Sequence, residues 1–418
     1  MKKIGLFLGT EPYTGGTFQY NQVILDAAAS LPENEFSVVV GYTSELWIKY
    51  LQNYYLKTIP VPLGFCGRAA GYLWKSLGLP VTIWRQVIPY FHPVAKTLLA
   101  ERCDIWIFPS QDQWGYEIPV PSLVAVHDLM HRYERRFPEV SGKGEYRRRE
   151  RHYKNICRWA KGVLVDSEVG KRQVMDSYGL DAERIHVLPF IAPAYMHAQK
   201  ENNDFDSRYQ LPKKFIFYPA QFWEHKNHKR LISAVEKLKH DIPDLKLVLV
   251  GSKKNGYESV VKLVQELNLM EDVIFLGYVP DEDIRQLYQR ARALVMPTFF
   301  GPTNIPPLEA FVAGCPVAIS GIYGMPEQVG DAALLFDPES VDEIAGSIRR
   351  LWIDDKLCND LTEKGRHKAA IWGQEQFNAR FRKIIEQIVF GYPKISGYKS
   401  GSARRKHREV GEEVCGFV

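Results

Sequence analysis

The stretch Phe215–Ala310 decides the fold class of this chain. It contains FIFYPAQFWEHKN, LKLVLVGS, VIFLGYVPD and LVMPTFFGPTNIPPLEA in that order, with amphipathic segments between them. Short apolar runs that alternate with helical segments are typical of a parallel sheet with helices on both faces. Each run stops at Gly, Pro or polar residues, and at that edge such sheets bind their ligands.

The first half of the chain repeats this alternation. Its strand candidates are Lys3–Leu8, Phe36–Gly41, Ile105–Phe108, Ser122–Val126, Gly162–Val165 and Arg184–Leu188, with helical patterns around Thr17–Ser30 and Lys154–Ala160. Residues 45–100 break the rhythm, and we expect them to form helices that partly cover the mouth of the domain. Because 418 residues exceed one ordinary core, the sequence predicts an α/β fold of two Rossmann-like, doubly wound domains that face each other across a cleft.

Changes in composition suggest where the domains end. The segment after Pro189 turns polar, so we assign residues 1–195 to the first domain and 196–375 to the second. Residues 376–391 are expected to form a helix that crosses back to the first domain. The Gly-, Ser- and Arg-rich end, 392–418, is expected to be a mobile basic tail.

Composition narrows the class of protein. Apolar residues make up 45%, charged residues 25%, and the net charge of +5 is modest. No run of about 18 uncharged apolar residues is present, and the apolar run near the N-terminus is too short for a signal peptide. Six scattered cysteines without a CxxC pair indicate reduced thiols, so we expect a cytoplasmic protein. Basic residues are not interleaved with aromatic ones along one stripe, which argues against a nucleic-acid partner.

Three segments carry the features of an anion site. Gly15 and Gly16 stand between the first strand and a helix, where a backbone without side chains lets a ligand approach the free N–H groups. Lys226 follows the strand FIFYPA and precedes an amphipathic helix. In the block Gly301–Glu309 the helix begins near two prolines, so the amides of Asn304 and Ile305 are expected to be free for phosphate oxygens. Glu309, one turn inside that helix, would accept sugar hydroxyls.

His127 ends the strand SLVAV. A neutral imidazole there would hydrogen-bond a substrate hydroxyl. His131 stands four residues later, but two histidines without a third ligand are a weak signal, and we expect no metal.

With these motifs the chain resembles retaining glycosyltransferases of the GT-B fold, of the family-4 type known as glycosyl transferases group 1. The resemblance runs through YPAQFWEHKN, LVLVGS, IPPLEAFVAGCPVAIS and GMPEQVGDAALLFDP, and in the first half through the GGT loop, VHD and VDSEVGK. It implies that Lys226 binds the donor diphosphate, that Glu309 holds the ribose, and that His127 contacts the donor sugar. The family's nucleobase loop matches Gly277, Tyr278 and Val279. The implied catalytic residues are therefore His127, Lys226 and Glu309, and the implied donor-binding set is Gly15, Gly16, Gln221, Lys226, Gly277, Tyr278, Val279, Thr303, Asn304, Ile305 and Glu309.

Two positions depart from the family pattern. Gln221 stands where the family usually has an arginine, and Gly301 stands where it has the first of two glutamates. Losing that carboxylate removes a charge-assisted hydrogen bond of roughly 1.5–3 kcal/mol. Thr303 and Asn304 would replace it with neutral contacts. We therefore expect an active enzyme with altered donor contacts, and keep a non-catalytic sugar-nucleotide or glycan-binding protein as the alternative. Gly301 argues against a third reading, a sugar-nucleotide 2-epimerase, which needs carboxylates around the sugar.

The resemblance also implies the reaction and its partners. A sugar would move from a nucleotide-diphosphate donor to a hydroxyl of a glycan or lipid-linked acceptor, with retention at the anomeric carbon, in bacterial surface polysaccharide or glycoconjugate synthesis. We find no carboxylate for a double displacement, so we expect front-face attack without a metal or other cofactor. Acceptor contacts are expected from residues 45–100 and from the loop near Gln111–Tyr116. The basic run in Lys143–Lys161 and the tail suggest peripheral contact with the inner membrane face.

Overall fold

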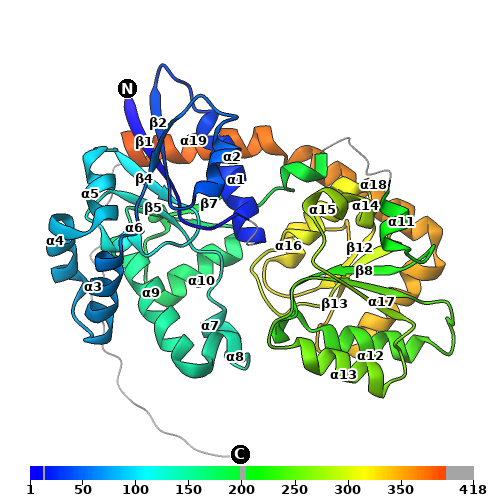
Figure 1. Cartoon of the computed structure of the whole chain (residues 1–418). Coiled ribbons are helices and arrows are strands. Elements are labelled where there is room, and N and C mark those ends of the chain that lie inside the picture. Colours follow the sequence, from blue (N-terminus) through cyan, green and yellow to red (C-terminus); the bar gives the residue numbers. More distant parts are fainter. Residues whose placement is uncertain (13–14, 198–203, 392–418) are drawn as a thin grey trace, which may run out of the picture.

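The computed structural model describes residues 1–12, 15–197 and 204–391. Two parallel sheets, each covered by helices, lie side by side (Figure 1). This arrangement confirms the predicted α/β fold of two Rossmann-like domains. The predicted tail, 392–418, lies outside the described residues.

In the first domain the described strands form a seven-stranded sheet in the order β3-β2-β1-β4-β5-β6-β7. The strands are β1 (Lys2–Leu8), β2 (Phe36–Tyr42), β3 (Lys57–Pro60), β4 (Ile105–Phe108), β5 (Ser122–Ala125), β6 (Gly162–Val165) and β7 (Ile185–Val187). All neighbours pair in parallel. Only β3 was not predicted, because KTIP is short, mostly exposed and lies at the edge of the sheet.

In the second domain the described strands form a six-stranded sheet in the order β10-β9-β8-β11-β12-β13. They are β8 (Ile216–Pro219), β9 (Leu247–Val250), β10 (Val273–Gly277), β11 (Ala293–Met296), β12 (Val317–Ser320) and β13 (Leu334–Phe336). These strands also pair in parallel. β8, β9, β11 and β12 are almost entirely buried, which fits their continuous apolar sequences.

Helices connect the strands in both domains. The first domain contains α1 (Gly16–Ala29), α2 (Ile48–Leu51), α3 (Phe65–Ser76), α4 (Val81–Phe91), α5 (Pro93–Ala100), α6 (Trp114–Glu117), α7 (Met130–Tyr133), α8 (Pro138–Ser141), α9 (Glu145–Trp159) and α10 (Glu168–Tyr178). Later in the chain come α11 (Phe205–Tyr209), α12 (His228–Leu238), α13 (Tyr257–Glu266), α14 (Asp281–Arg290), α15 (Pro306–Ala313), α16 (Met325–Val329), α17 (Val341–Ile353), α18 (Asp355–Ile371) and α19 (Gln374–Phe390). α12 illustrates the pattern: Leu231, Ile232, Val235 and Leu238 recur at helical spacing, and all are buried.

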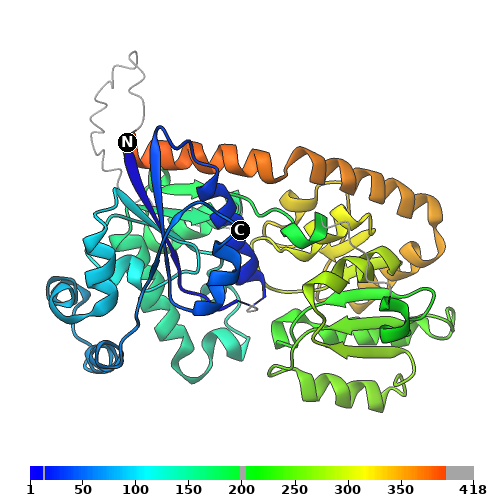
Figure 2. The same cartoon turned by 45° about the horizontal axis from the view of Figure 1, so that its top comes forward.

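The last helix returns to the first domain. Phe377, Phe381, Ile384, Ile385 and Ile388 of α19 belong to the same buried cluster as Ile4, Leu6 and Ile24. Figure 2 shows α18 beside the second domain and α19 running on across the first. The chain therefore crosses between the domains twice, once after β7 and once at Trp372–Gly373.

The domains touch directly across the cleft. Met130, Phe137 and Val140 of the first domain form a buried cluster with Phe299 and Phe300 of the second. Around it, the Glu139 carboxylate accepts hydrogen bonds from the His225 backbone at 3.0 Å and from the Asn255 amide at 2.9 Å. The two domains are therefore in direct contact through apolar side chains and hydrogen bonds.

One prediction about residues 45–100 is wrong. The segment is mostly helical, as expected, but α3, α4 and α5 lie on the side of the first domain away from the second (Figure 1). Trp74 and Trp84 anchor α3 and α4 on the core of their own domain. The aromatic residues therefore serve packing within that domain, and these helices do not cover the cleft. Among the described residues, no helix is long and apolar enough to cross a membrane.

Candidate active site

Three of the predicted segments, Gly15–Gly16, Lys226 and the Glu309 block, follow strands at the positions where each sheet reverses its strand order. In the second domain β8 and β11 are neighbours. From β8 the chain proceeds to β9 and β10 on one side of the sheet, and from β11 it proceeds to β12 and β13 on the other side. Lys226 follows β8 in a short 3-10 turn, Glu224–Lys226, and Glu309 lies in α15 after β11. Parallel α/β sheets bind ligands at such a switch point. Lys226 and Glu309 are thus presented at one edge of one sheet.

The glycine pair of the first domain faces this edge. A Cβ atom built on Gly16 would lie 3.3 Å from Cδ1 of Ile305, and one on Gly15 would lie 3.8 Å from Nε2 of Gln221. Gly15 also has a φ of 73°, which favours glycine. The structure therefore brings Gly15, Gly16, Gln221 and Ile305 together, from both domains.

Lys226 is a partly buried cation. Its ammonium group has neither a hydrogen bond nor an ion pair with any residue in the described ranges. Burial lowers its pKa to about 8, and the Asp128 carboxylate opposes that shift. A partly buried positive charge that has no ion pair among the described residues is suited to bind an anionic ligand.

His127 is held in one tautomer. Its Nε2 lies 2.9 Å from the carbonyl oxygen of Pro109, which can only accept, so Nε2 carries the proton and Nδ1 is the acceptor. Burial lowers the pKa of the ring, against the opposing effects of this carbonyl and of Asp128. The rings of Tyr20 and Phe190 pack against it at 5.0 and 5.9 Å between centroids. A neutral imidazole in this state can accept a hydrogen bond from a sugar hydroxyl.

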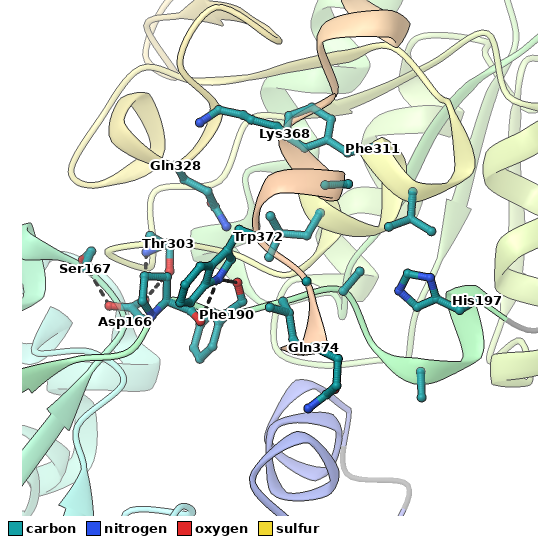
Figure 3. A pocket seen from close by; sticks show the side chains of 18 of the residues that line it. Asp166, Ser167, Phe190, His197, Thr303, Phe311, Gln328, Lys368, Trp372 and Gln374 are labelled. Carbon is teal, nitrogen blue, oxygen red and sulfur yellow. Dashed lines mark hydrogen bonds between the residues drawn. The ribbon is translucent and has the colours of Figure 1, made fainter. Parts of the chain in front are cut away.

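The loop Gly301–Ile305 is held by two side chains that the sequence did not reveal. Asp166, at the end of β6, accepts hydrogen bonds from the Thr303 backbone at 3.1 Å and from the Thr303 hydroxyl. Gln328 accepts from the Asn304 backbone at 3.0 Å and donates to the Asn304 carbonyl at 2.6 Å. Figure 3 shows Asp166, Thr303 and Gln328 converging from the two domains.

These contacts correct the expectation that the amide of Asn304 is free for phosphate. Its N–H already donates to Gln328. The two prolines that follow Ile305 have no N–H, so the amides that remain for a ligand are those of Ile305 and of the Gly15–Gly16 turn. The loop therefore offers a ligand neutral side-chain contacts and few free backbone N–H donors.

Gly301 is fixed by its surroundings. Its φ is 96°, and a Cβ atom there would lie 2.6 Å from the Thr303 carbonyl oxygen and 3.0 Å from Nδ2 of Asn304. A longer side chain at this position would require the loop to move. The conformation of this loop therefore requires glycine at residue 301.

Glu309 is buried and already hydrogen-bonded. One carboxylate oxygen accepts from the hydroxyl of Tyr195, and the other accepts from Tyr288 at 2.7 Å. Burial raises the pKa of Glu309, and both hydroxyls oppose that rise. Ribose hydroxyls would therefore have to share these oxygens or displace the hydroxyl of Tyr195.

The predicted nucleobase loop follows β10 at the edge of the sheet. Tyr278 is 63% exposed, Val279 is buried, and a Cβ atom on Gly277 would meet open space. The loop ends at Asp281, which accepts a hydrogen bond of 2.7 Å from Gln19 of the first domain and interacts electrostatically with Glu309. The charge of Asp281 therefore helps to raise the pKa of Glu309, whereas the Tyr278 side chain is largely exposed to solvent.

Asp166, Tyr195, Gln19 and Gln328 were missed because each acts through a distant partner. Asp166 offered the one usable signal, since a carboxylate directly after a buried strand lies at the ligand-binding edge. Asp166 stands in the segment VDSEVGK, which carries part of the resemblance but to which no role at the site is assigned from the sequence. Tyr195 and Gln328 carry no local pattern that predicts contact with α15 or its loop.

A cavity of about 500 Å³ lies beside the loop, at the two crossings between the domains (Figure 3). Its walls are mostly apolar and include Phe190, Phe311 and Trp372, with Asp166 and Thr303 at one end. The Trp372 indole donates to the carbonyls of Pro189 and Phe190 at 3.3 and 3.2 Å, which ties the crossings together. Neither Lys226 nor Glu309 lines this space, and it adjoins the candidate site through Thr303.

Metal binding has no support in the side chains. In residues 1–12, 15–197 and 204–391, no group of three or more His, Cys, Asp or Glu side chains could hold an ion. The His131 ring instead approaches Glu150 at 3.2 Å and stacks on Tyr153. Metal-independent chemistry remains a prediction.

Comparison with known proteins identifies a matching family model and similar bacterial enzymes. The family description "Glycosyl transferases group 1" matches residues 199–368. The chain is similar to O-antigen chain mannosyltransferase B of Escherichia coli, with 30% identity over 56% of this chain and 62% of the relative. It is also similar to the O-antigen chain mannosyltransferase RfbU of Salmonella typhimurium, with 28% identity over 46% of this chain and 51% of the relative. The chain thus spans between half and two thirds of the length of these relatives.

Solved structures agree on the architecture. Anabaena Alr3699/HepE in complex with UDP is 17% identical, with a TM-score of 0.67 over 93% of this chain and 100% of that one. WaaG, a glycosyltransferase involved in lipopolysaccharide biosynthesis, is 18% identical, with a TM-score of 0.64 over 92% and 99%. The chain has the GT-B fold, and its residues 199–368 match the glycosyl transferases group 1 family.

Proposed function

We propose that this protein is a glycosyltransferase that moves a hexose from a nucleoside diphosphate to a hydroxyl group of a glycan or lipid-linked acceptor. The observation that carries the proposal is the placement of three groups at the sheet edges where the two domains face each other. They are the Lys226 ammonium, which has no hydrogen bond or ion pair among the described residues, the Gly15–Gly16 turn and the Glu309 carboxylate. A cation and free amides suit a diphosphate, and a carboxylate suits ribose hydroxyls.

The similar proteins support a mannosyl donor. Two of them are named as O-antigen chain mannosyltransferases, which also supports a role in bacterial surface polysaccharide synthesis. His127 would accept a hydrogen bond from a donor-sugar hydroxyl through Nδ1. At residue 301 the loop offers no carboxylate, so sugar contacts there would come from Thr303 and the side chain of Asn304.

Transfer with retention would proceed on one face of the sugar. The acceptor oxygen bonds to the anomeric carbon on the side from which the diphosphate leaves, and the bond from that carbon to the phosphate oxygen breaks. The acceptor proton passes to the departing phosphate oxygen. Lys226 and the Gly15–Gly16 amides would stabilise the charge that develops there, which needs no metal or other cofactor.

We place the reaction in the cytoplasm, where nucleotide sugars are available, with peripheral contact at the inner membrane face if the acceptor is lipid-linked. The alternative, a sugar-nucleotide or glycan-binding protein without catalysis, is favoured by Gln221 and Gly301. Together they remove one positive and one negative charge from the pattern that the family usually presents.

A two-stage experiment separates these functions. Nucleoside diphosphates and their sugars are first screened by thermal shift, where a donor at 100 times its dissociation constant stabilises by about 2.7 kcal/mol. The donor found is then incubated with hydroxyl acceptors, and released nucleoside diphosphate and new glycoside are measured. Binding with transfer supports the enzyme. Binding without hydrolysis or transfer supports the alternative, and the lack of any nucleotide binding contradicts both.

A further inference from the structure

A side chain of the first domain holds the turn that carries Lys226. This turn, Glu224–Lys226, follows β8 in the second domain. Glu139 lies in α8 of the first domain, on the side that faces the second domain (Figure 1). Its Oε1 accepts a hydrogen bond from the backbone N–H of His225 at 3.0 Å and lies 2.6 Å from Nδ1 of the same residue. Since a carboxylate only accepts, Nδ1 of His225 is the donor.

The second oxygen of Glu139 reaches the same turn through Asn255. The Asn255 side chain donates from Nδ2 to Oε2 of Glu139 at 2.9 Å, and its Oδ1 accepts from the backbone N–H of Glu224 at 3.2 Å. The first two N–H groups of the turn therefore depend on Glu139, one directly and one through Asn255.

The carbonyl groups of the turn are held within the second domain. The His225 carbonyl accepts from the backbone N–H of Phe299 at 2.9 Å, and the Lys226 carbonyl accepts from the hydroxyl of Tyr218 at 2.9 Å. The second domain thus fixes one side of the turn, and the first domain fixes the other.

The contact between Glu139 and His225 lies largely out of water. Their side chains are 7% and 10% exposed, and the His225 ring stacks on Phe300 with 3.7 Å between centroids. Burial alone would raise the pKa of Glu139, but the hydrogen bonds from His225 and Asn255 outweigh it and lower the pKa to about 2. The carboxylate is therefore charged at neutral pH, and charge-assisted hydrogen bonds in such surroundings are strong.

We propose that Glu139 is a positioning residue, which holds the Glu224–Lys226 turn from the other domain so that the Lys226 ammonium lies at the leaving diphosphate. The inference rests on the proposed function, in which Lys226 binds that diphosphate. Within the described residues no hydrogen bond or ion pair holds the ammonium itself, so its place depends on the backbone of the turn. A misplacement of about 1 Å can lower a rate by roughly 100-fold.

The test is a double-mutant cycle between Glu139 and Lys226 in the full chain. The probe is the tightest binder among UDP, GDP and ADP, and its affinity is measured by titration calorimetry. Glu139→Ala should weaken binding by about tenfold in the parent, but by less than about twofold in Lys226→Ala, because a lysine that is absent cannot be misplaced.

Turnover gives a second measurement. In the transfer assay Glu139→Ala should lower kcat by about tenfold or more and change the KM for the acceptor by less than about twofold. Damage confined to the first domain, where the acceptor contacts are expected, would raise that KM instead. Glu139→Gln keeps the size and one acceptor oxygen and should recover part of kcat, whereas a role for the negative charge alone would make it equal to Glu139→Ala.

Tyr323→Phe is the matched control. The Tyr323 hydroxyl donates to Glu134 of the first domain at 2.6 Å, so this variant removes a hydrogen bond between the domains that does not involve the turn. It should bind the nucleotide and turn over like the parent. If thermal unfolding shows that Glu139→Ala is not folded, Asn255→Ala takes its place in the cycle. Asn255 is exposed, and its removal frees the N–H of Glu224.

The outcomes separate this inference from the proposed function. Absence of nucleotide binding in the parent contradicts both. Binding in the parent, with equal losses from Glu139→Ala whether or not Lys226 is present, overturns the positioning role alone. A loss in Tyr323→Phe as large as that in Glu139→Ala also overturns it, because the effect would then belong to contact between the domains in general.

Discussion

The Asp166 carboxylate of the first domain accepts both the backbone N–H and the hydroxyl of Thr303 in the second domain. Both residues are buried, with 3% and 8% of their surface exposed. Thr303 belongs to the loop that leads into α15 and Glu309. The contact therefore couples the closure of the two domains to the shape of the loop at the candidate donor site.

Replacing Asp166 tests that coupling. Asp166→Ala leaves two buried donors of Thr303 unpaired, at a cost of about 1–3 kcal/mol each, and should weaken nucleotide binding at least tenfold. Asp166→Asn keeps one acceptor oxygen and should recover part of the affinity. Titration calorimetry with the nucleotide found in the screen measures both. Equal affinity in the parent and Asp166→Ala would show that the loop is held without this contact.

The same carboxylate predicts a pH effect on stability. Burial raises the pKa of Asp166 from 3.8 to about 6, against the opposing hydrogen bonds of Thr303 and Ser167. The folded state then binds the proton more tightly than the unfolded state, so the contribution of this group to stability falls as pH rises from about 4 to about 6. Asp166→Asn lacks this titration. Denaturant unfolding at pH 4.5 and 7 should show the variant gaining stability relative to the parent at the higher pH, and parallel pH profiles would contradict the raised pKa.

The lowered pKa of Lys226 predicts that the affinity for an anionic ligand depends on pH. Its pKa is lowered to about 8 by burial, and only the protonated form attracts a diphosphate. Affinity for a nucleoside diphosphate should therefore fall as pH rises through 8, by up to tenfold per unit. Lys226→Arg stays charged and should remove this dependence, whereas Lys226→Ala should lose roughly 1.5–3 kcal/mol of binding at pH 7.

Turnover separates the role of Lys226 in the reaction from its role in binding. Because charge develops on the departing phosphate, Lys226→Ala should lower kcat far more than it raises the KM for the acceptor. Lys229→Ala, an exposed lysine three residues later, is the control and should leave both constants near those of the parent. Near-normal kcat in Lys226→Ala would remove the residue from the proposed mechanism.

The strand pattern and the strand-end residues were enough to predict the two sheets and the edge that holds Lys226 and Glu309. Buried parallel strands are continuous apolar runs, and ligand edges follow from topology. Contacts between distant segments could not be predicted this way. Thr303 meets Asp166 only after the two domains have packed together. Glu309 meets Tyr195, and the Asn304 amide meets Gln328, only after the second domain has folded. The aromatic residues of α3 and α4 were placed over the cleft because composition does not specify which side of a domain a helix covers.

Replacing Gln221 with arginine should raise the affinity for a nucleoside diphosphate. Nε2 of Gln221 lies 3.8 Å from the position of a Cβ atom on Gly15, where the Gly15–Gly16 turn faces the second domain. Gln221→Arg adds a cation there and should tighten binding of a nucleoside diphosphate by up to roughly 1.5–3 kcal/mol, most strongly at low salt. Gln221→Met, without charge or donor, is the size-matched control. Unchanged affinity in Gln221→Arg would place residue 221 away from the phosphates.

Restoring the missing glutamate should fail at residue 301. A Cβ atom there would lie 2.6 Å from the Thr303 carbonyl oxygen, and the backbone φ of 96° is unfavourable for any residue but glycine. Gly301→Glu should therefore lower both the unfolding temperature and nucleotide affinity, and Gly301→Ala should do so nearly as strongly because the conflict begins at Cβ. A stable Gly301→Glu variant with higher activity would mean that the loop adapts freely.

The two tyrosines on Glu309 should behave differently when their hydroxyls are removed. Tyr288 is fully buried, so Tyr288→Phe leaves one carboxylate oxygen without its donor and should destabilise the fold by about 1–3 kcal/mol. Tyr195 is only partly buried and lies in the crossing between the domains. If ribose hydroxyls replace the hydroxyl of Tyr195 at Glu309, Tyr195→Phe should keep or raise nucleotide affinity, while Glu309→Gln lowers it. Calorimetric titration of the three variants decides the point, because equal losses of affinity in Tyr195→Phe and Glu309→Gln would mean that the tyrosine and the carboxylate bind the nucleotide as one unit.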